Sequence, residues 1–76
     1  MTTMIPVKSS VLSALGYDPE KEELYAEFMN GNRYVYRGVP SILYDRLLKS
    51  PSIGGFFMKN IMGTFKCQKL PSKGKS

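Results

Sequence analysis

The chain has 76 residues, of which 42% are apolar and 22% are charged, and its formal net charge is +5. A chain of this length builds one small hydrophobic core, which excludes a second domain and most enzyme folds. It has a single cysteine and no histidine, which excludes an internal disulfide and any catalytic or metal site that depends on imidazole.

Residues 1–8 are predicted to form a flexible N-terminal arm, because Pro6 has no backbone N–H to give to an early strand. Structure is predicted to begin near Ser9. Apolar and polar residues then alternate up to Tyr17, which favours a half-buried strand whose inward set is Val11, Ser13, Leu15 and Tyr17. Leu12 and Ala14 keep a short helix open as the alternative.

A turn is predicted at Asp18-Pro19-Glu20-Lys21. Proline fixes its own φ near the value that the second position of a turn requires, and the Asp18 carboxylate can accept a hydrogen bond from the backbone two residues on. The chain is expected to reverse here into a second strand, which ends near Phe28.

The next hairpin surrounds Asn30-Gly31 and allows two registers. A two-residue turn would pair Glu27 with Tyr34 and set the later tyrosines opposite the apolar face of the preceding strand. A three-residue loop with Gly31 in the left-handed conformation would pair Ala26 with Tyr34 and place Glu27 opposite Arg33. We predict the second register, because it gathers five residues on one buried face: Leu24, Ala26, Phe28, Tyr34 and Tyr36.

Two helices are predicted after the hairpin. Val39-Pro40-Ser41 opens the first helix and Pro51 ends it, while Ser52 is positioned to cap the second. The apolar residues at helical spacing are Ile42, Leu43, Leu47 and Leu48 in the first helix and Ile53, Phe57 and Ile61 in the second. Residues 66–76 are predicted to be a basic disordered tail, so residues 9–65 form the domain. The predicted fold is α+β, with a three-stranded antiparallel sheet followed by two helices.

The basic residues are concentrated late in the chain. Residues 1–27 carry two lysines and five carboxylates, a net charge of −3, whereas residues 28–76 carry nine basic groups and one carboxylate, a net charge of +8. This distribution favours phosphate-bearing partners such as nucleic acid. A solubilising surface with a basic tail is an equally good explanation. The expected electrostatic contacts in the tail are Lys66, Lys69, Lys73 and Lys75.

The start of the second helix is one candidate ligand site. Ser52, Gly54 and Gly55 would expose backbone N–H groups at the positive end of the helix dipole, and Lys59 would add charge, which suits a phosphate. The alternative is that the two glycines only allow close packing between the helix and the sheet. On local sequence the packing explanation is slightly favoured.

The strand after Gly31 is a second candidate site. Tyr34 and Tyr36 alternate with Arg33 and Arg37, a combination that can stack bases and hold phosphates. The predicted register turns both tyrosines toward the core, which favours core tyrosines with surface arginines. Tyr25 would then be the exposed ring on the outer face of the sheet.

Few residues could support catalysis. Lys8 next to Ser9 and Ser10 is a poor nucleophile pair, since adjacent residues rarely face each other, and Cys67 beside Lys66 is better explained as an incidental thiol. We therefore expect no enzyme activity, no cofactor and no metal. The sequence contains neither a bilayer-spanning apolar run nor an export signal, which predicts a cytoplasmic protein with no membrane partner. Its small core and the consecutive Phe56-Phe57-Met58 favour a homo-oligomer.

The stretch from Val7 to Phe65 resembles the KTSC domain, a short family named for the C-terminus of some lysyl-tRNA synthetases and also found alone in bacteria and phages. The residues that carry the resemblance are Ser9-Ser10, Gly16-Tyr17-Asp18, Leu24-x-Ala26-x-Phe28-x-x-Gly31, Tyr34-x-Tyr36, Val39-Pro40, Ser52-x-Gly54, Phe56-Phe57 and Ile61. The resemblance implies three strands followed by two helices, and an RNA-binding role. Gly55, Met58 and the lysine-rich segment after Phe65 depart from the family pattern.

Two functions are expected from these features. The first is a non-catalytic module that binds RNA, with Arg33, Arg37, Lys59, Lys66 and Lys69 as phosphate contacts. The alternative is a small phage-type oligomer that sequesters a nucleotide-derived signalling molecule in a pocket between subunits, where Ser52, Gly54 and Tyr36 would dominate.

Overall fold

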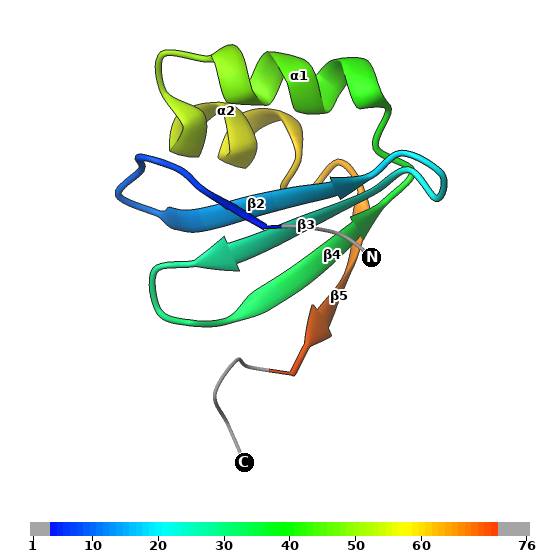
Figure 1. Ribbon diagram of the computed structural model, residues 1–76, viewed down its shortest axis with the longest axis horizontal. Coiled ribbons are helices and arrows are strands. Elements are labelled where there is room, and N and C mark those ends of the chain that lie inside the picture. Colours follow the sequence, from blue (N-terminus) through cyan, green and yellow to red (C-terminus); the bar gives the residue numbers. More distant parts are fainter. Residues whose placement is uncertain (1–3, 72–76) are drawn as a thin grey trace.

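The computed structural model describes residues 4–71, which form one five-stranded antiparallel sheet and two helices (Figure 1). The elements in chain order are β1 (Ile5–Pro6), β2 (Leu12–Asp18), β3 (Glu23–Phe28), β4 (Arg33–Arg37), α1 (Ser41–Lys49), α2 (Ile53–Asn60) and β5 (Lys66–Leu70). Spatial order follows chain order from β1 to β5, and both helices cover the same face of the sheet. The α+β class is confirmed, whereas the expected three strands are corrected to five.

The two unexpected strands lie at the edges of the sheet. In β1, Pro6 pairs with Ala14 of β2, and an edge position tolerates proline because its missing N–H is not needed by a second neighbour. The predicted arm therefore includes a short strand. In β5, five consecutive residues pair with β4, so residues 66–70 are not part of a disordered tail. Residues 72–76 of that predicted tail lie outside the described residues.

The predicted register of the central hairpin is confirmed. Ala26 pairs with Tyr34, and Glu27 pairs with Arg33. Gly31 has a φ of 92°, a left-handed conformation that glycine adopts without strain. Its N–H donates to the Phe28 carbonyl at 2.9 Å, which closes the loop and brings the apolar residues of both strands to one face.

Strand β2 departs from the uniform alternation that the sequence predicted. Its register with β3 shifts between Leu12 and Ala14, so that Ser13 is an extra residue in β2. Such a bulge moves the residues before it to the other face of the sheet. As a result Leu12 and Leu15 are both fully buried, and Ser13 is not part of the inward set.

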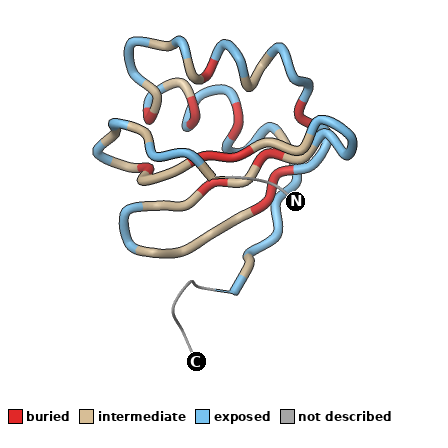
Figure 2. Tube along the Cα trace, in the orientation of Figure 1, coloured by how far each residue is buried: buried red, intermediate tan, exposed pale blue. Residues whose placement is uncertain are grey.

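The core lies between the sheet and the helices (Figure 2). Phe57 of α2 is its centre, since the ring meets Phe28 and Tyr36 edge to face at centroid distances of 5.7 and 5.2 Å. The buried hydrophobic residues of the described chain are Leu12, Leu15, Leu24, Ala26, Val35, Tyr36, Val39, Leu47, Phe57 and Ile61. Val35 alone among them is positioned on the opposite face of the sheet from the helices.

The helix boundaries agree with the sequence signals. Pro40 precedes α1 as its N-cap, and α1 ends at Lys49, two residues before Pro51. The Ser52 hydroxyl caps α2 by accepting a hydrogen bond from the Gly55 N–H at 3.3 Å. Of the consecutive residues Phe56, Phe57 and Met58 in α2, Phe57 is buried, whereas Met58 is 52% exposed. That one of the three meets a partner subunit stays a prediction.

Candidate functional site

The pleat of the sheet separates the predicted site residues onto two faces. Tyr34 and Tyr36 lie on the face that the helices cover, as their packing around Phe28 and Phe57 shows. Alternation then puts Arg33 and Arg37 on the opposite face, together with Tyr25. The register of β5 continues this division, with Cys67 and Lys69 on the helix side and Lys66, Gln68 and Leu70 on the outer side.

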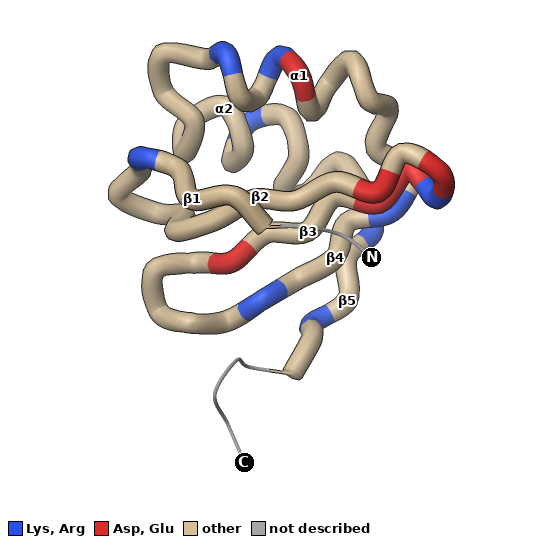
Figure 3. Tube along the Cα trace, viewed as in Figure 1, with Lys and Arg blue, Asp and Glu red and all other residues tan. Residues whose placement is uncertain are grey.

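The acidic first part and the basic second part of the sequence are not separated in the folded protein. Antiparallel pairing brings the acidic residues of β3 against the basic residues of β4: Arg33 forms an ion pair with Glu27 at 3.4 Å, and Arg37 with Glu23 at 3.1 Å. Figure 3 shows basic residues spread over the molecule and acidic residues gathered mainly at the turn between β2 and β3. The two arginines are therefore largely neutralised as phosphate contacts.

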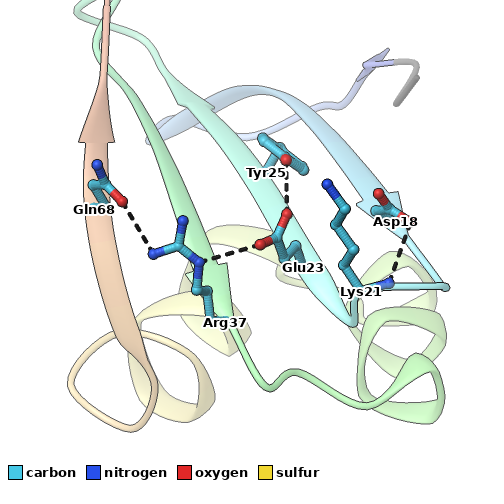
Figure 4. Close-up of polar contacts among 6 residues, drawn as sticks. All are labelled: Asp18, Lys21, Glu23, Tyr25, Arg37 and Gln68. Carbon is cyan, nitrogen blue, oxygen red and sulfur yellow. Dashed lines mark hydrogen bonds and ion pairs between the residues drawn. The ribbon is translucent and has the colours of Figure 1, made fainter.

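A chain of polar side chains crosses the outer face of the sheet (Figure 4). The Tyr25 hydroxyl donates to Glu23 Oε1 at 2.9 Å, Arg37 Nε donates to Glu23 Oε2, and Arg37 Nη1 donates to Gln68 Oε1 at 3.0 Å. The hydrogen bond from Tyr25, followed by that from Arg37, holds the pKa of Glu23 below its usual value. The same bond to Glu23 raises the pKa of Tyr25.

The outer face also contains a cleft of about 360 Å³, which we name the outer cleft. Charged and apolar side chains both line it. The lining residues are Met4, Asp18, Lys21, Tyr25, Ala26, Arg33, Tyr34 and Leu70. The turn prediction for Asp18 is confirmed here, because its Oδ1 accepts the Glu20 N–H at 3.0 Å and the Lys21 N–H at 3.4 Å.

A second concavity, of about 330 Å³, lies on the helix side between the β3–β4 loop and the segment that follows α2, and we name it the tyrosine groove. Aromatic and amide side chains dominate its lining, which consists of Phe28, Asn30, Asn32, Tyr34, Tyr36, Met62, Gly63 and Cys67. Tyr36 is 2% exposed and joins the core to the groove. Burial, followed by the neighbouring Cys67 and Tyr34, raises the pKa of Tyr36 to about 12. Both tyrosines therefore pack against the core and line the groove.

The start of α2 only partly matches the predicted phosphate site. Ser52, Gly55 and Lys59 line one open depression together with Phe56, Met58 and Asn60. Gly54 does not face this depression. A Cβ added to Gly54 would lie 2.8 Å from Ser9 Oγ and 3.4 Å from Val11 Cγ2, which is the packing role that the sequence slightly favoured. The structure does not bring Ser52 and Gly54 into one concavity with Tyr36.

The predicted tail residues have separate outcomes. Lys66 and Lys69 are exposed residues of β5 on opposite faces of the sheet. Lys73 and Lys75 lie outside the described residues. Within residues 4–71, no three His, Cys, Asp or Glu side chains are grouped closely enough to hold a metal ion.

Sequence reasoning did not identify several of the residues that line the two concavities. Asn30 is predicted only as part of the Asn-Gly turn, and no role is predicted from the sequence for Asn32, Met62 or Leu70. The Asn-Gly-Asn spacing was the available sign, because asparagine is common in such turns, where its side chain bonds the backbone two residues on, as Asn30 Oδ1 does with the Asn32 N–H at 3.0 Å. Leu70 depended on the existence of β5, which the sequence did not predict.

Comparison with known proteins assigns the family. The family model of the KTSC domain matches residues 8–65. A protein from Tsukamurella paurometabola is 43% identical over 53 residues, which cover 70% of this chain and 79% of that protein. A lysine–tRNA ligase from Nostoc is 34% identical over 67 residues, which cover 88% of this chain and 12% of the ligase.

The fold has a solved counterpart. The crystal structure of a KTSC domain protein from Yersinia pestis superposes with a TM-score of 0.91 at 34% identity, covering 93% of this chain and all of that one. Neither helix within residues 4–71 has the length and apolar content needed to cross a membrane. The family match, which includes all of β2 to α2, and the agreement in fold lead to one conclusion: the chain belongs to the KTSC domain family.

Proposed function

We propose that this KTSC domain is a non-catalytic module that binds RNA in the cytoplasm and holds an unpaired base in the tyrosine groove. The observation that carries the proposal is the groove itself, a concavity with an accessible aromatic side chain and two asparagine side chains beside a basic strand. Its volume lies at the lower end of the range typical of small-molecule sites, which suits a single nucleotide unit.

Tyr34 is the stacking residue in this proposal. Its side chain is half-buried, and its ring meets Phe28 edge to face at 5.6 Å, so the ring is held in place before any ligand arrives. A preformed aromatic surface accepts any base because every base presents a π face. Asn30 and Asn32 line the groove. Asn30 Oδ1 accepts the Asn32 N–H at 3.0 Å, which leaves the two side-chain NH₂ groups and Asn32 Oδ1 to pair with base edges.

Lys69 is positioned to contact the phosphate that follows the base. It is the cross-strand partner of Tyr34 on the helix-side face, and directly opposed side chains on one face lie about 5 Å apart at Cβ. No carboxylate lines the groove. Lys69 forms no ion pair within residues 4–71, so its ammonium group is available to a phosphate.

The relatives add independent support. The Nostoc protein that contains a similar segment is a lysine–tRNA ligase, an enzyme whose name includes an RNA substrate. A domain that contacts RNA without chemistry of its own is a consistent addition to such an enzyme. The phosphate roles first expected for Arg33 and Arg37 are not part of the proposal, because both guanidinium groups pair with glutamates.

Fluorescence anisotropy with a short labelled single-stranded RNA tests the proposal. Tyr34→Leu keeps apolar bulk but removes the stacking surface, and it should weaken binding about tenfold, since stacking contributes ~1–3 kcal/mol per base. Lys69→Gln should weaken binding and lower the slope of log K against log salt by about 0.7. Lys49→Gln on α1 is the matched control and should change neither quantity beyond a small general effect. Equal affinities for all four proteins would overturn the proposal.

The rival function, sequestration of a nucleotide-derived signal between subunits, is separated by ligand size. Free mononucleotides are titrated against the same variants. If a mononucleotide binds as tightly as the RNA and loses affinity with Tyr34→Leu, the groove is a nucleotide site and the RNA proposal is wrong. Native mass spectrometry of the same samples reports the number of subunits and so checks the expected homo-oligomer.

A further inference from the structure

The outer cleft differs chemically from the tyrosine groove and lies on the other face of the sheet. Two side chains of opposite charge, Asp18 and Lys21, line it. Neither takes part in an ion pair within residues 4–71. Figure 4 shows the Lys21 side chain extended between Tyr25 and Asp18. The cleft therefore presents a cation and an anion that do not neutralise each other by contact.

The Asp18 carboxylate is held in place by the turn. Its Oδ1 accepts two backbone N–H groups, from Glu20 and Lys21, which fixes the orientation of the carboxylate. These bonds leave Oδ2 as an acceptor for a positively charged group. Because the position is set by the backbone, a ligand that meets this carboxylate does not have to order it first.

Arg33 also lines this cleft, and its Nη2 pairs with Glu27 at 3.4 Å. Lys21 is thus the cation in the cleft lining that has no ion-pair partner among the described residues. A carboxylate oxygen placed in the cleft would be an acceptor of the right charge for Lys21.

The remaining walls of the cleft are apolar. Met4 and Leu70 contribute aliphatic side chains. Tyr25 contributes its ring, because its hydroxyl is already engaged by Glu23. An aliphatic group of a few carbon atoms would therefore be in contact with apolar surface while its polar end meets the charges.

We propose that the outer cleft binds a zwitterionic small molecule of the α-amino acid type with an apolar side chain. Its carboxylate accepts from Lys21, its ammonium group meets Asp18, and its side chain packs between Met4, Leu70 and the Tyr25 ring. The charges around the cleft favour a zwitterion over an anion. The charge of Asp18 balances that of Lys21, and Glu27 balances Arg33. A ligand without net charge therefore keeps the net charge of the site at zero. A phosphate dianion would be repelled by Asp18.

Amide chemical shifts of the ¹⁵N-labelled protein test this proposal with L-leucine, its methyl ester, its N-acetyl derivative and inorganic phosphate as probes. Leucine should shift the amides of Tyr25, Arg33 and Leu70 in a saturable manner. The ester lacks the carboxylate and the N-acetyl derivative lacks the ammonium group, so each should bind at least about tenfold more weakly. Phosphate should not compete.

Asp18→Asn is the decisive variant, because asparagine keeps the Oδ1 acceptor that holds the turn and removes only the charge. It should weaken leucine about tenfold and leave the N-acetyl derivative unchanged. Asp45→Asn on α1 is the control and should alter neither. No saturable shifts with leucine, or equal binding of leucine and N-acetyl-leucine, would overturn the proposal. RNA affinity of the Asp18→Asn protein, measured alongside, separates this outcome from failure of the RNA proposal.

Discussion

At the scale of single residues, Gly54 lies so close to the chain segment before β2 that a Cβ built on it would be 2.8 Å from Ser9 Oγ. Ser9 Oγ accepts the N–H groups of Val11 and Leu12 at 3.0 and 3.2 Å, so it is anchored and cannot swing away from a new methyl group. Gly54, a candidate ligand-site residue in the sequence, therefore serves to pack α2 against the segment that leads into β2.

Gly54→Ala is expected to destabilise the protein by about 1–3 kcal/mol, the usual cost of forcing an extra methyl into a packed site, even though alanine has the higher helix propensity. Urea denaturation measures the loss. In a Ser9→Ala background the 2.8 Å conflict disappears, so the same substitution should cost much less. An equal cost in both backgrounds would show that Ser9 is not the obstacle.

At the scale of elements, β5 is attached to the sheet by its backbone pairing with β4. A series of side-chain hydrogen bonds also reaches it, from Tyr25 through Glu23 and Arg37 to Gln68. The residues of β5 do not alternate between apolar and polar, and four of the five are exposed. No hydrophobic periodicity therefore predicts this strand. The strand is held by its backbone hydrogen bonds to β4 and by its packing over Val35. Neither interaction can be recognised from the local sequence.

Truncation tests the revised boundary of the domain. A protein that ends at Pro71 keeps β5 and should unfold at nearly the same temperature as the full chain. A protein that ends at Phe65 loses β5, exposes Val35 and Tyr36, and should unfold many degrees lower, at about 4–8 °C per kcal/mol for a domain of this size. Equal thermal midpoints for the two truncated proteins would show that β5 adds nothing to stability.

Glu23 makes the attachment of β5 dependent on pH. Its pKa is lowered in the folded state, so its contribution to stability is present above the unfolded pKa and is lost as pH falls through the folded pKa. Glu23→Gln should therefore be less stable than the parent protein at neutral pH and approach it in stability at acidic pH. Urea denaturation of both proteins across that range measures the difference, and a gap that is constant with pH would contradict the assignment.

At the scale of the whole molecule, the features predicted correctly from the sequence are those that depend on interactions between neighbouring residues. The register set by Gly31, the turn at Asp18 and the cap at Ser52 all follow from nearby residues and are confirmed. The bulge at Ser13 and the pairing of β5 with β4 depend on partners distant in sequence. Strand β1 pairs with nearby residues, but Pro6 concealed it. The cancellation of charge between β3 and β4 is likewise a product of pairing, which a count along the chain cannot anticipate.

The molecule as a whole should lose stability in alkali. Burial raises the pKa of Tyr17, Tyr36 and Tyr44, that of Tyr36 to about 12, and the bond to Glu23 raises that of Tyr25. Groups with raised pKa values stabilise the fold fully below their unfolded pKa, near 10, and this contribution is lost as pH rises through the folded values. Chemical denaturation at stepped pH should show the decline beginning near pH 10, and Tyr36→Phe should reduce it. A decline of the same size in Tyr36→Phe would contradict the role of this group.

The position of β5 at the end of the element order has a consequence for synthesis on the ribosome. Strand β4 emerges next to β3 with one side bare, and both helices must follow before Lys66–Leu70 arrives to pair with it. Until then Val35 and Tyr36 are incompletely covered, and the nascent chain offers an unpaired strand to any neighbour. The synthesis of β5 is thus also the step that protects β4 from intermolecular pairing.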